Sequence, residues 1–321
     1  MASARFPLSD HCDGRKFFNP GHPAEHGLGD LLKWKFTAHP VPWPKPMALP
    51  RGPALARGPD QIAVTWLGHS TFLISTPAGN FLTDPVLRDR IGPVSWAGPR
   101  RVVPPALTAA QLPQIDTVLL SHDHFDHCDL PTLRQLRRDW APTVVSPLGY
   151  APFLGRAGAG DSVIELDWWQ SRELSGGVAV TVLPARHWCR RRPGATNVRL
   201  WGGFMLTVAG RRICFAGDSA YDETLFKEIG RRMGPPDLAL VPIGAYEPRW
   251  FMKGAHANPA EAVQIHRDLG AKRSVAMHWG TFRLTDEGRE QPIVDLDRAR
   301  ISSGLTSAEF TVLDPGGSVL L

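Results

Sequence analysis

The sequence predicts an α/β sandwich in which helices pack on the outside of β-sheets. Short runs rich in β-branched and apolar residues recur from residue 62 onward, and amphipathic segments with helical spacing fall between them. The 321 residues include 31 glycines and 30 prolines, which indicates many turns and argues against a helical bundle. Hydrophobic residues make up 43% of the chain, enough for a substantial core. The strand and helix segments do not alternate regularly enough for a barrel.

Strands are expected wherever a short apolar run is bounded by glycine, proline or polar turn residues. The first three runs are close together, so we expect them to form a hairpin or meander that opens the domain. The expected strands are residues 62–67, 71–75, 80–83, 117–121, 143–146, 162–166, 178–183, 203–208, 212–216, 238–242, 274–278 and 310–313.

Three helices are expected between these strands, over residues 129–140, 222–233 and 259–269. Each places apolar side chains three or four positions apart, which puts them on one face of a helix. The third helix has the clearest ends, because Asn258 can cap it, Glu261 stands at the capping-box position and Gly270 follows.

The first 60 residues differ from the rest of the chain. Proline or glycine occurs every few positions, and only residues 28–36 form a short amphipathic stretch. The alternating prolines from Pro40 to Pro46 favour an extended run. We therefore expect residues 1–60 to form an arm that packs on the core or on a partner subunit, and residues 61–321 to form one domain.

Charge and composition limit the partners and the location. Lys and Arg total 36 against 31 Asp and Glu, an excess of 5 that suits an anionic substrate or membrane surface but predicts no nucleic-acid partner. The longest apolar run, residues 238–245, is interrupted by Pro242 and Gly244, and residues 1–20 contain no apolar signal-peptide core. We therefore expect a cytoplasmic protein with reduced thiols. Cys128 and Cys189 stand beside histidines, where they are either packing residues or metal ligands.

The most informative segment is Ser-His-Asp-His-Phe-Asp-His at residues 121–127. Side chains alternate along an extended chain, so His122, His124 and Asp126 can point to one side, and the turn into the next helix brings His127 beside them. Imidazoles with a few carboxylates suit zinc, or else iron or manganese, better than calcium or magnesium. The segment therefore predicts a metal site at the end of a strand.

This H-x-H-x-D-H spacing resembles the metal-binding motif of the metallo-β-lactamase superfamily. Three further candidates, His187, Asp218 and His278, follow strand-like runs in the expected order. The resemblance implies an αββα sandwich of two mixed β-sheets flanked by helices. It also implies two divalent metal ions, Zn²⁺ first and Fe or Mn as alternatives. It assigns one ion to His122, His124 and His187, the other to Asp126, His127 and His278, and makes Asp218 the bridge.

Further segments look like the branch of this superfamily that hydrolyses N-acyl-phosphatidylethanolamine by phospholipase D chemistry. The similarity extends over about residues 17–284, and its most specific parts are His187-Trp188-Cys189-Arg190 and His278-Trp279-Gly280-Thr281-Phe282. It implies that residues 61–321 are a catalytic domain, in which a metal-bridging hydroxide attacks the lipid phosphodiester. It also implies a homodimer that contacts membranes, here peripherally at the inner membrane face.

Several other residues are candidates for the site. Asp84 either orients a ligand histidine and the bridging water or is a turn residue before Pro85. His256 can reach the leaving group, or else is an ordinary loop histidine. The expected catalytic residues are Asp126, Asp218, His256 and Asp84, and the expected substrate-binding residues are Arg186, Arg190, Trp188 and His69.

Two alternative functions stay open from the sequence. The same fold and metal site also serve a lactonase, or another ester or nucleotide phosphodiesterase, because neither fixes the substrate. In a non-enzymatic alternative the metal stabilises a binding or sensing protein. His and carboxylate ligands with room for water favour a catalytic site over a closed structural one.

Overall fold

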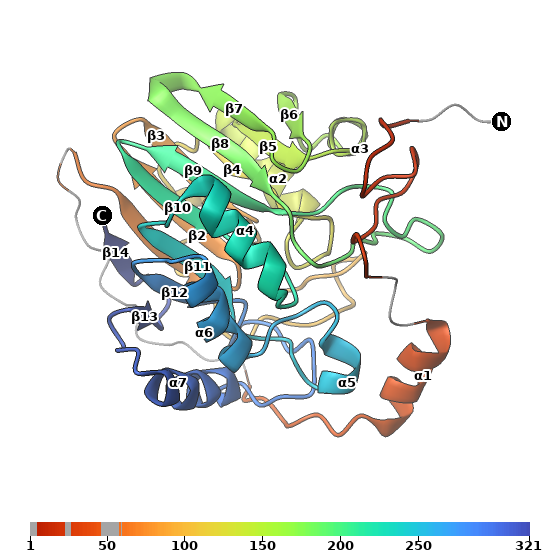
Figure 1. The fold of residues 1–321 in the computed structure, drawn as a ribbon. Coiled ribbons are helices and arrows are strands. Elements are labelled where there is room, and N and C mark those ends of the chain that lie inside the picture. The colour runs from red at the N-terminus through yellow and green to blue at the C-terminus, as the bar shows by residue number, and fades with distance from the viewer. Residues whose placement is uncertain (1–4, 23–26, 46–57, 59) are drawn as a thin grey trace.

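Two seven-stranded β-sheets pack against each other and carry helices on their outer sides in the computed structural model (Figure 1). The structure describes residues 5–22, 27–45, 58 and 60–321. Both sheets contain parallel and antiparallel pairs, so the predicted sandwich of two mixed sheets is confirmed.

The first sheet begins with an antiparallel meander, as the spacing of the first strands predicted. Its strands β14, β1, β2 and β3 pair antiparallel, and β3, β4, β5 and β6 continue in parallel. In spatial order they are β14 (Ser318–Leu320), β1 (Ala63–Gly68), β2 (Thr71–Thr76), β3 (Gly79–Thr83), β4 (Thr117–Leu119), β5 (Thr143–Pro147) and β6 (Val163–Leu166).

The second sheet has the same mixture. Strands β13 to β10 pair in parallel, and β10, β9, β8 and β7 pair antiparallel. In spatial order they are β13 (Phe310–Thr311), β12 (Ser274–Met277), β11 (Leu238–Pro242), β10 (Arg211–Phe215), β9 (Gly203–Val208), β8 (Val178–Leu183) and β7 (Ser171–Leu174).

The three predicted helices are confirmed, and each has a side-chain cap at its start. Asp129 accepts from Thr132, Asp222 accepts from Thr224 and Leu225, and Asn258 forms a capping box with Glu261. The α-helices are α1 (Leu28–Thr37), α2 (Leu130–Trp140), α3 (Ala151–Arg156), α4 (Glu223–Met233), α5 (Arg249–Met252), α6 (Pro259–Asp268) and α7 (Gln291–Ser303). Short 3₁₀ turns lie at Ala109–Gln111 and Ser175–Gly177.

The core lies between the sheets because each contributes an apolar inner face. Phe72 and Val145 from the first sheet join Phe204 and Phe215 from the second in one buried cluster. Leucines of α2 and α3 form a second cluster against the outer side of the first sheet. Burial on this scale, at roughly 25 cal/mol per Å² of apolar surface, holds the two sheets in a fixed relation. Strand ends from both sheets can therefore present side chains to a shared site.

The described parts of the N-terminal segment contact the domain of the same chain. His11 Nε2 lies 2.8 Å from Asp167 Oδ1, and the Phe17 N–H donates to the carbonyl of Asn197 at 2.9 Å. Further along, the indole N–H of Trp34 donates to Asp286. Residues 1–4, 23–26, 46–57 and 59 of the expected arm lie outside the described residues. The helices of the described chain include none with the length and apolar character needed to cross a membrane.

Candidate metal centre

Four strands from the two sheets end beside one another and carry the predicted metal ligands. The His122–His127 turn follows β4 of the first sheet. In the second sheet, β8 is followed by His187, β10 by Asp218 and β12 by His278. Five of the seven side chains lie in buried residues, while His124 and Asp126 are half-buried. The structure therefore brings together every ligand that the sequence predicted.

One group of nitrogen atoms belongs to His122, His124 and His187. The Nδ1 atom of His124 lies 3.0 Å from Nε2 of His122 and 3.3 Å from Nε2 of His187. These three ligand atoms all fall within 4.8 Å of one another. Three imidazole nitrogens that converge on one point are a suitable donor set for a transition-metal ion.

A second group combines carboxylates with imidazoles. Asp126 Oδ2 lies 3.5 Å from His278 Nε2 and 3.6 Å from His127 Nε2. Asp218 Oδ2 is 3.1 Å from each of these two nitrogens, and it is also 3.8 Å from His122 Nε2 and 3.9 Å from His187 Nε2. Asp218 is therefore within reach of both groups, as a bridging carboxylate would be.

Buried polar atoms in this cluster indicate that a cation fits it. In the described part of the chain, Nε2 of His127, Nε2 of His278 and Oδ1 of Asp218 are buried and make no hydrogen bond. A buried polar atom without a partner costs about 1–3 kcal/mol. Coordination to a metal ion satisfies such atoms, and the imidazole and carboxylate donors match zinc, iron or manganese.

The protonation states also suit metal binding. Burial, reinforced by the neighbouring His187, lowers the pKa of His124 to about 3. Burial likewise lowers the pKa of His187 to about 4 against the opposing charge of Asp218. Although burial raises the pKa of Asp218, the neighbouring His127 and His278 outweigh it and hold that pKa well below its usual value. His124 and His187 are therefore neutral and Asp218 is ionised, which are the forms that bind metals. Burial lowers the pKa of His278, but the carboxylates of Asp218 and Asp126 outweigh it and raise that pKa to about 9, so a cation bound there displaces a proton.

Surrounding groups fix the rings. Asp84 Oδ2 lies 2.7 Å from Nδ1 of His127, and its Oδ1 accepts the Ser121 N–H at 2.7 Å. His187 Nδ1 donates to the carbonyl oxygen of Ala255 at 2.9 Å. Each contact uses the ring nitrogen that faces away from the cluster, so the other nitrogen is directed toward Asp218.

The two remaining candidate histidines also belong to the cluster. His69 Nε2 lies 3.1 Å from Asp126 Oδ2, and its ring centroid is 4.1 Å from that of His278. His256 Nδ1 lies 3.9 Å from Asp218 Oδ2, and the His256 ring centroid is 5.1 Å from that of His187. Neither residue is remote from the predicted ligands.

Of the candidate substrate-binding residues other than His69, Trp188 contacts a ligand ring. The Trp188 ring centroid is 4.5 Å from that of His124, at an interplanar angle of 70°. Arg190 is exposed, and its guanidinium lies 5.2 Å from the Trp188 ring centroid. The Arg186 N–H donates to Ser219 Oγ at 3.0 Å. Trp188 therefore lies between the Arg190 guanidinium and the His124 ring.

Both cysteines in question are buried and lie outside every His, Asp and Glu group of ligand spacing found in the described residues. Burial raises the pKa of the Cys128 thiol to about 12, so the thiol stays protonated. The Cys189 thiol donates to the carbonyl of Arg199 at 2.9 Å. These contacts favour the interpretation of both as packing residues.

Three residues beside the cluster are not among the expected ligands, catalytic residues or substrate-binding residues, namely Asp123, Arg191 and Arg199. Asp123 stands between two predicted ligands, and its carboxylate pairs with the Arg199 guanidinium. Arg191 donates to backbone carbonyls of the same turn. Two of them have a local sequence signal, because Asp123 lies inside the histidine motif and Arg191 belongs to a run of arginines, residues 190–192, beside His187.

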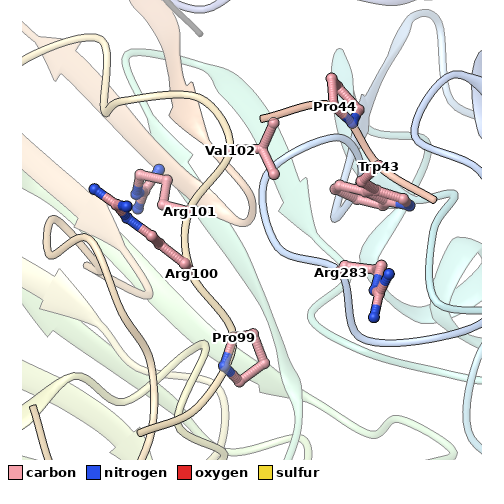
Figure 2. A pocket seen from close by; sticks show the side chains of 7 residues that line it. All are labelled: Trp43, Pro44, Pro99, Arg100, Arg101, Val102 and Arg283. Carbon is pink, nitrogen blue, oxygen red and sulfur yellow. The ribbon is translucent and has the colours of Figure 1, made fainter. Parts of the chain in front are cut away.

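A cavity of about 390 Å³ lies away from the histidines, between Trp43 of the N-terminal segment and residues 99–102 (Figure 2). Arg100 and Arg283 on its wall are exposed, and Figure 2 shows Arg100 and Arg101 extending away from Trp43. The Arg101 guanidinium instead lies 4.8 Å from the Phe282 ring centroid. None of the residues that line this cavity is a predicted metal ligand.

Comparison with known proteins agrees with this geometry. A family model described as "Beta-lactamase superfamily domain" matches residues 79–279. The chain belongs to the metallo-β-lactamase superfamily. One member, N-acyl-phosphatidylethanolamine-hydrolyzing phospholipase D 1 of Caenorhabditis elegans, is 41% identical over 265 residues, which cover 78% of this chain and 74% of that protein.

Two more members extend the comparison. A UPF0173 metal-dependent hydrolase of Rubrobacter xylanophilus is 34% identical over 263 residues, covering 79% of this chain and 94% of its own length. The solved structure of Igni18, a metallo hydrolase from Ignicoccus hospitalis, superposes with a TM-score of 0.61 at 20% identity and covers 81% of this chain and 98% of that one. The Igni18 match shows the shared fold. The family model and the hydrolase relatives identify this chain as a metal-dependent hydrolase of the metallo-β-lactamase fold.

Proposed function

We propose that this hydrolase holds two divalent metal ions, with zinc first and iron or manganese as alternatives. We further propose that it cleaves the phosphodiester of N-acyl-phosphatidylethanolamine-like lipids in the manner of a phospholipase D. The observation that carries the proposal is the position of Asp218 Oδ2, within 3.9 Å of nitrogens from four predicted ligand histidines. The lipid substrate is inferred from the 41% identical relative named for that reaction.

The proposed ligands form two groups, one for each ion. His122, His124 and His187 would hold one, and Asp126, His127 and His278 the other, with Asp218 between them. Bound divalent ions lower the pKa of water toward neutrality and offset developing negative charge on an oxygen. Two divalent ions with two carboxylates leave a positive site, which suits an anionic phosphodiester.

The chain's own residues supply orientation and substrate contacts. Asp84 holds the His127 ring, and the carbonyl of Ala255 holds that of His187. His256 Nδ1 is buried without a hydrogen bond in the described residues, and the side chain is 14% exposed, so it is placed to reach a leaving group. Trp188, which lies against the His124 ring, would contact the substrate together with Arg186 and Arg190. In this proposal residues 61–321 form the catalytic domain.

We also propose that the protein is cytoplasmic and makes peripheral contact with the inner face of a membrane. Helices α1 and α5 expose large apolar side chains, with Phe36 at 87%, Leu32 at 49% and Trp250 at 43%. Lys33 Nζ lies 4.8 Å from the Trp250 ring centroid. Apolar side chains interleaved with lysines suit the interface of an anionic lipid surface.

The test is an assay of the metal-loaded chain against three substrates. We expect turnover of N-acyl-phosphatidylethanolamine in vesicles, with bis-nitrophenyl phosphate cleaved more slowly. Hydrolysis of acyl-homoserine lactones alone would instead identify a lactonase. No turnover of any of the three at full metal occupancy would favour a binding or sensing protein. The variant His278→Ala is the matched control for contaminating activity, because it removes a proposed ligand.

A further inference from the structure

Two loops from different sheets meet at the proposed centre. Residues 121–128, the ligand turn, follow β4 of the first sheet, and residues 184–202, the His187 loop, join β8 to β9 of the second. The proposed ion group of His122, His124 and His187 draws on both loops. The packed sheets fix the strand ends, but hydrogen bonds within one sheet do not reach the loops beyond those ends, so contacts between the loops contribute to their relative position.

Arg199 of the His187 loop makes the first such contact. Its Nε and Nη2 donate to Asp123 Oδ2 at 2.9 and 2.5 Å, and Asp123 stands between His122 and His124. Both partners are buried, with Asp123 at 0% and Arg199 at 8% exposed. The guanidinium also lies 4.3 Å from the Phe153 ring centroid. A buried, charge-assisted pair of this kind has one defined geometry.

Arg191 makes the second contact, to the backbone of the same turn. Its Nη1 donates to the carbonyl oxygens of Asp123 at 3.0 Å and Cys128 at 2.6 Å, and lies 3.5 Å from that of His124. The guanidinium stands 4.0 Å from the Phe125 ring centroid. One arginine thus holds both ends of the ligand turn from the loop that carries His187.

We propose that Arg191 and Arg199 are positioning residues that hold the ligand turn and the His187 loop in register. They thereby set the affinity of the ion group formed by His122, His124 and His187. Neither arginine touches reacting atoms, because both act through the turn. The inference rests on the proposed function only in taking the histidine cluster as a site for two ions.

Loss of either arginine is expected to affect only one of the two ion groups. A shift between the two loops separates His187 from His122 and His124, whereas Asp126, His127 and His278 include no residue of the His187 loop. Loss of either arginine should therefore weaken one of the two metal-binding steps. Removing residues that orient metal ligands typically costs about 10–100-fold in affinity.

The experiment is a zinc titration of the full chain by calorimetry, with metal content measured after dialysis against a competing chelator. In Arg191→Met and Arg199→Lys we expect one step about 10–100-fold weaker and the other unchanged. Arg199→Lys keeps the charge but loses the two-pronged contact with Asp123. Arg192→Met is the matched control, because Arg192 lies on the same loop and is exposed. It should bind both ions as the native chain does.

A double variant guards against misfolding. Asp123→Asn with Arg199→Met replaces the buried ion pair without leaving a lone charge, so it should fold. It should still show the weakened step. The inference would be wrong if Arg191→Met, Arg199→Lys and the double variant all showed a reduced melting temperature but bound both ions with native affinity. The two arginines would then be structural residues only. If the native chain itself bound no ion, the proposed function would fail instead, and the two failures are distinguishable.

Discussion

Asp84 and His127 form a buried pair in which Oδ2 of the carboxylate lies 2.7 Å from Nδ1 of the imidazole. The same oxygen accepts the Ser121 hydroxyl at 2.5 Å. Both oxygens of Asp84 accept hydrogen bonds from Ser121, so Asp84 acts as an acceptor and holds a proton on Nδ1 of His127. The other ring nitrogen, Nε2, then faces Asp218, 3.1 Å away. Asp84, which precedes Pro85, thus contacts His127, a proposed ligand 43 positions later in the chain.

Asp84→Asn tests this relationship. The amide can still contact the ring, but it no longer favours the Nδ1–H tautomer. We expect metal affinity to fall about 10–100-fold, as is typical when a carboxylate behind a ligand histidine is lost. Calorimetric titration with zinc measures the change.

The control is Asp116→Asn, which alters an exposed aspartate that accepts a backbone N–H from Asn80. It should leave zinc affinity unchanged. Native affinity in Asp84→Asn would show that the pair serves only the turn before Pro85.

His187→Ala should reduce metal content and activity together, because it removes the one proposed ligand contributed by β8. We expect one ion per chain in place of two, measured by elemental analysis after gel filtration. His266→Ala is the matched control, since His266 is a buried histidine of α6 that contacts Ser274 Oγ at 2.8 Å, outside the cluster. That variant loses stability but keeps both ions. Two ions in His187→Ala would refute the ligand assignment.

The sequence predicted the helices and strands in which the spacing of apolar residues matches the face that packs on the core. Capped helices such as α2 and α6 carry an apolar face, and the start of α6 was predicted from Asn258 and Glu261. Helix α7 was not predicted, because it buries only Pro292, Leu296 and Ala299 and so lacks a continuous apolar stripe. Strand β7 was missed because its first three residues are exposed. The sequences of α7 and β7 therefore do not distinguish them from polar loops.

At the site, the sequence predicted the ligands and, as one of two roles for Asp84, a contact with a ligand histidine, but it did not predict the contacts of Arg191 and Arg199. The ligands were predicted from two signals, namely the apolar strand before each of them and the close spacing of those in the 121–127 segment. Both signals lie within a few residues of the ligands themselves. Arg199 and Asp123 stand 76 positions apart, and their pairing depends on how the two sheets pack. Arg191 binds backbone carbonyls, which every residue type provides. Only the tertiary structure reveals such partners.

Chelation should destabilise the chain as well as inactivate it. An ion that binds only the folded state adds about 4 kcal/mol when its free concentration is 1,000 times its Kd. Removing it also leaves buried nitrogens such as His278 Nε2 unpartnered. We expect a lower melting temperature after chelator treatment, restored by Zn²⁺, Mn²⁺ or Fe²⁺ but not by Mg²⁺. Identical melting curves with and without chelator would contradict ion binding at this cluster.

The contact between the N-terminal segment and the domain should depend on pH through His11. Burial lowers the pKa of His11, but contacts at 2.8 Å with Asp167 and 2.6 Å with Asp10 outweigh it, so the folded-state pKa is raised. Protonated His11 therefore adds stability fully below the unfolded pKa of about 6.5. That contribution is lost as the pH rises through the higher folded pKa.

The measurement is the difference in free energy of unfolding between the native chain and His11→Gln, from urea titrations at several pH values. We expect the largest difference near pH 5.5 and a smaller one at pH 9. Asp167→Asn removes one acceptor and should reduce this pH dependence. A difference that stays constant across this range would show that folding leaves the pKa of His11 unchanged, and one that grows with pH would show that folding lowers it.

Gly244→Ala should displace a proposed ligand through the backbone. A Cβ at this position would lie 2.0 Å from the carbonyl oxygen of His278, and no flexible side chain is there to move aside. The ends of β11 and β12 must then separate. We expect a loss of about 3 kcal/mol in the free energy of unfolding, at the upper end for overpacking, together with weaker metal binding. Gly155→Ala in α3 is the control, because its Cβ meets nothing within 4 Å and alanine favours helices by about 1 kcal/mol. Urea titration and metal content of both variants decide the outcome, and native metal affinity in Gly244→Ala would show that His278 tolerates movement of its strand.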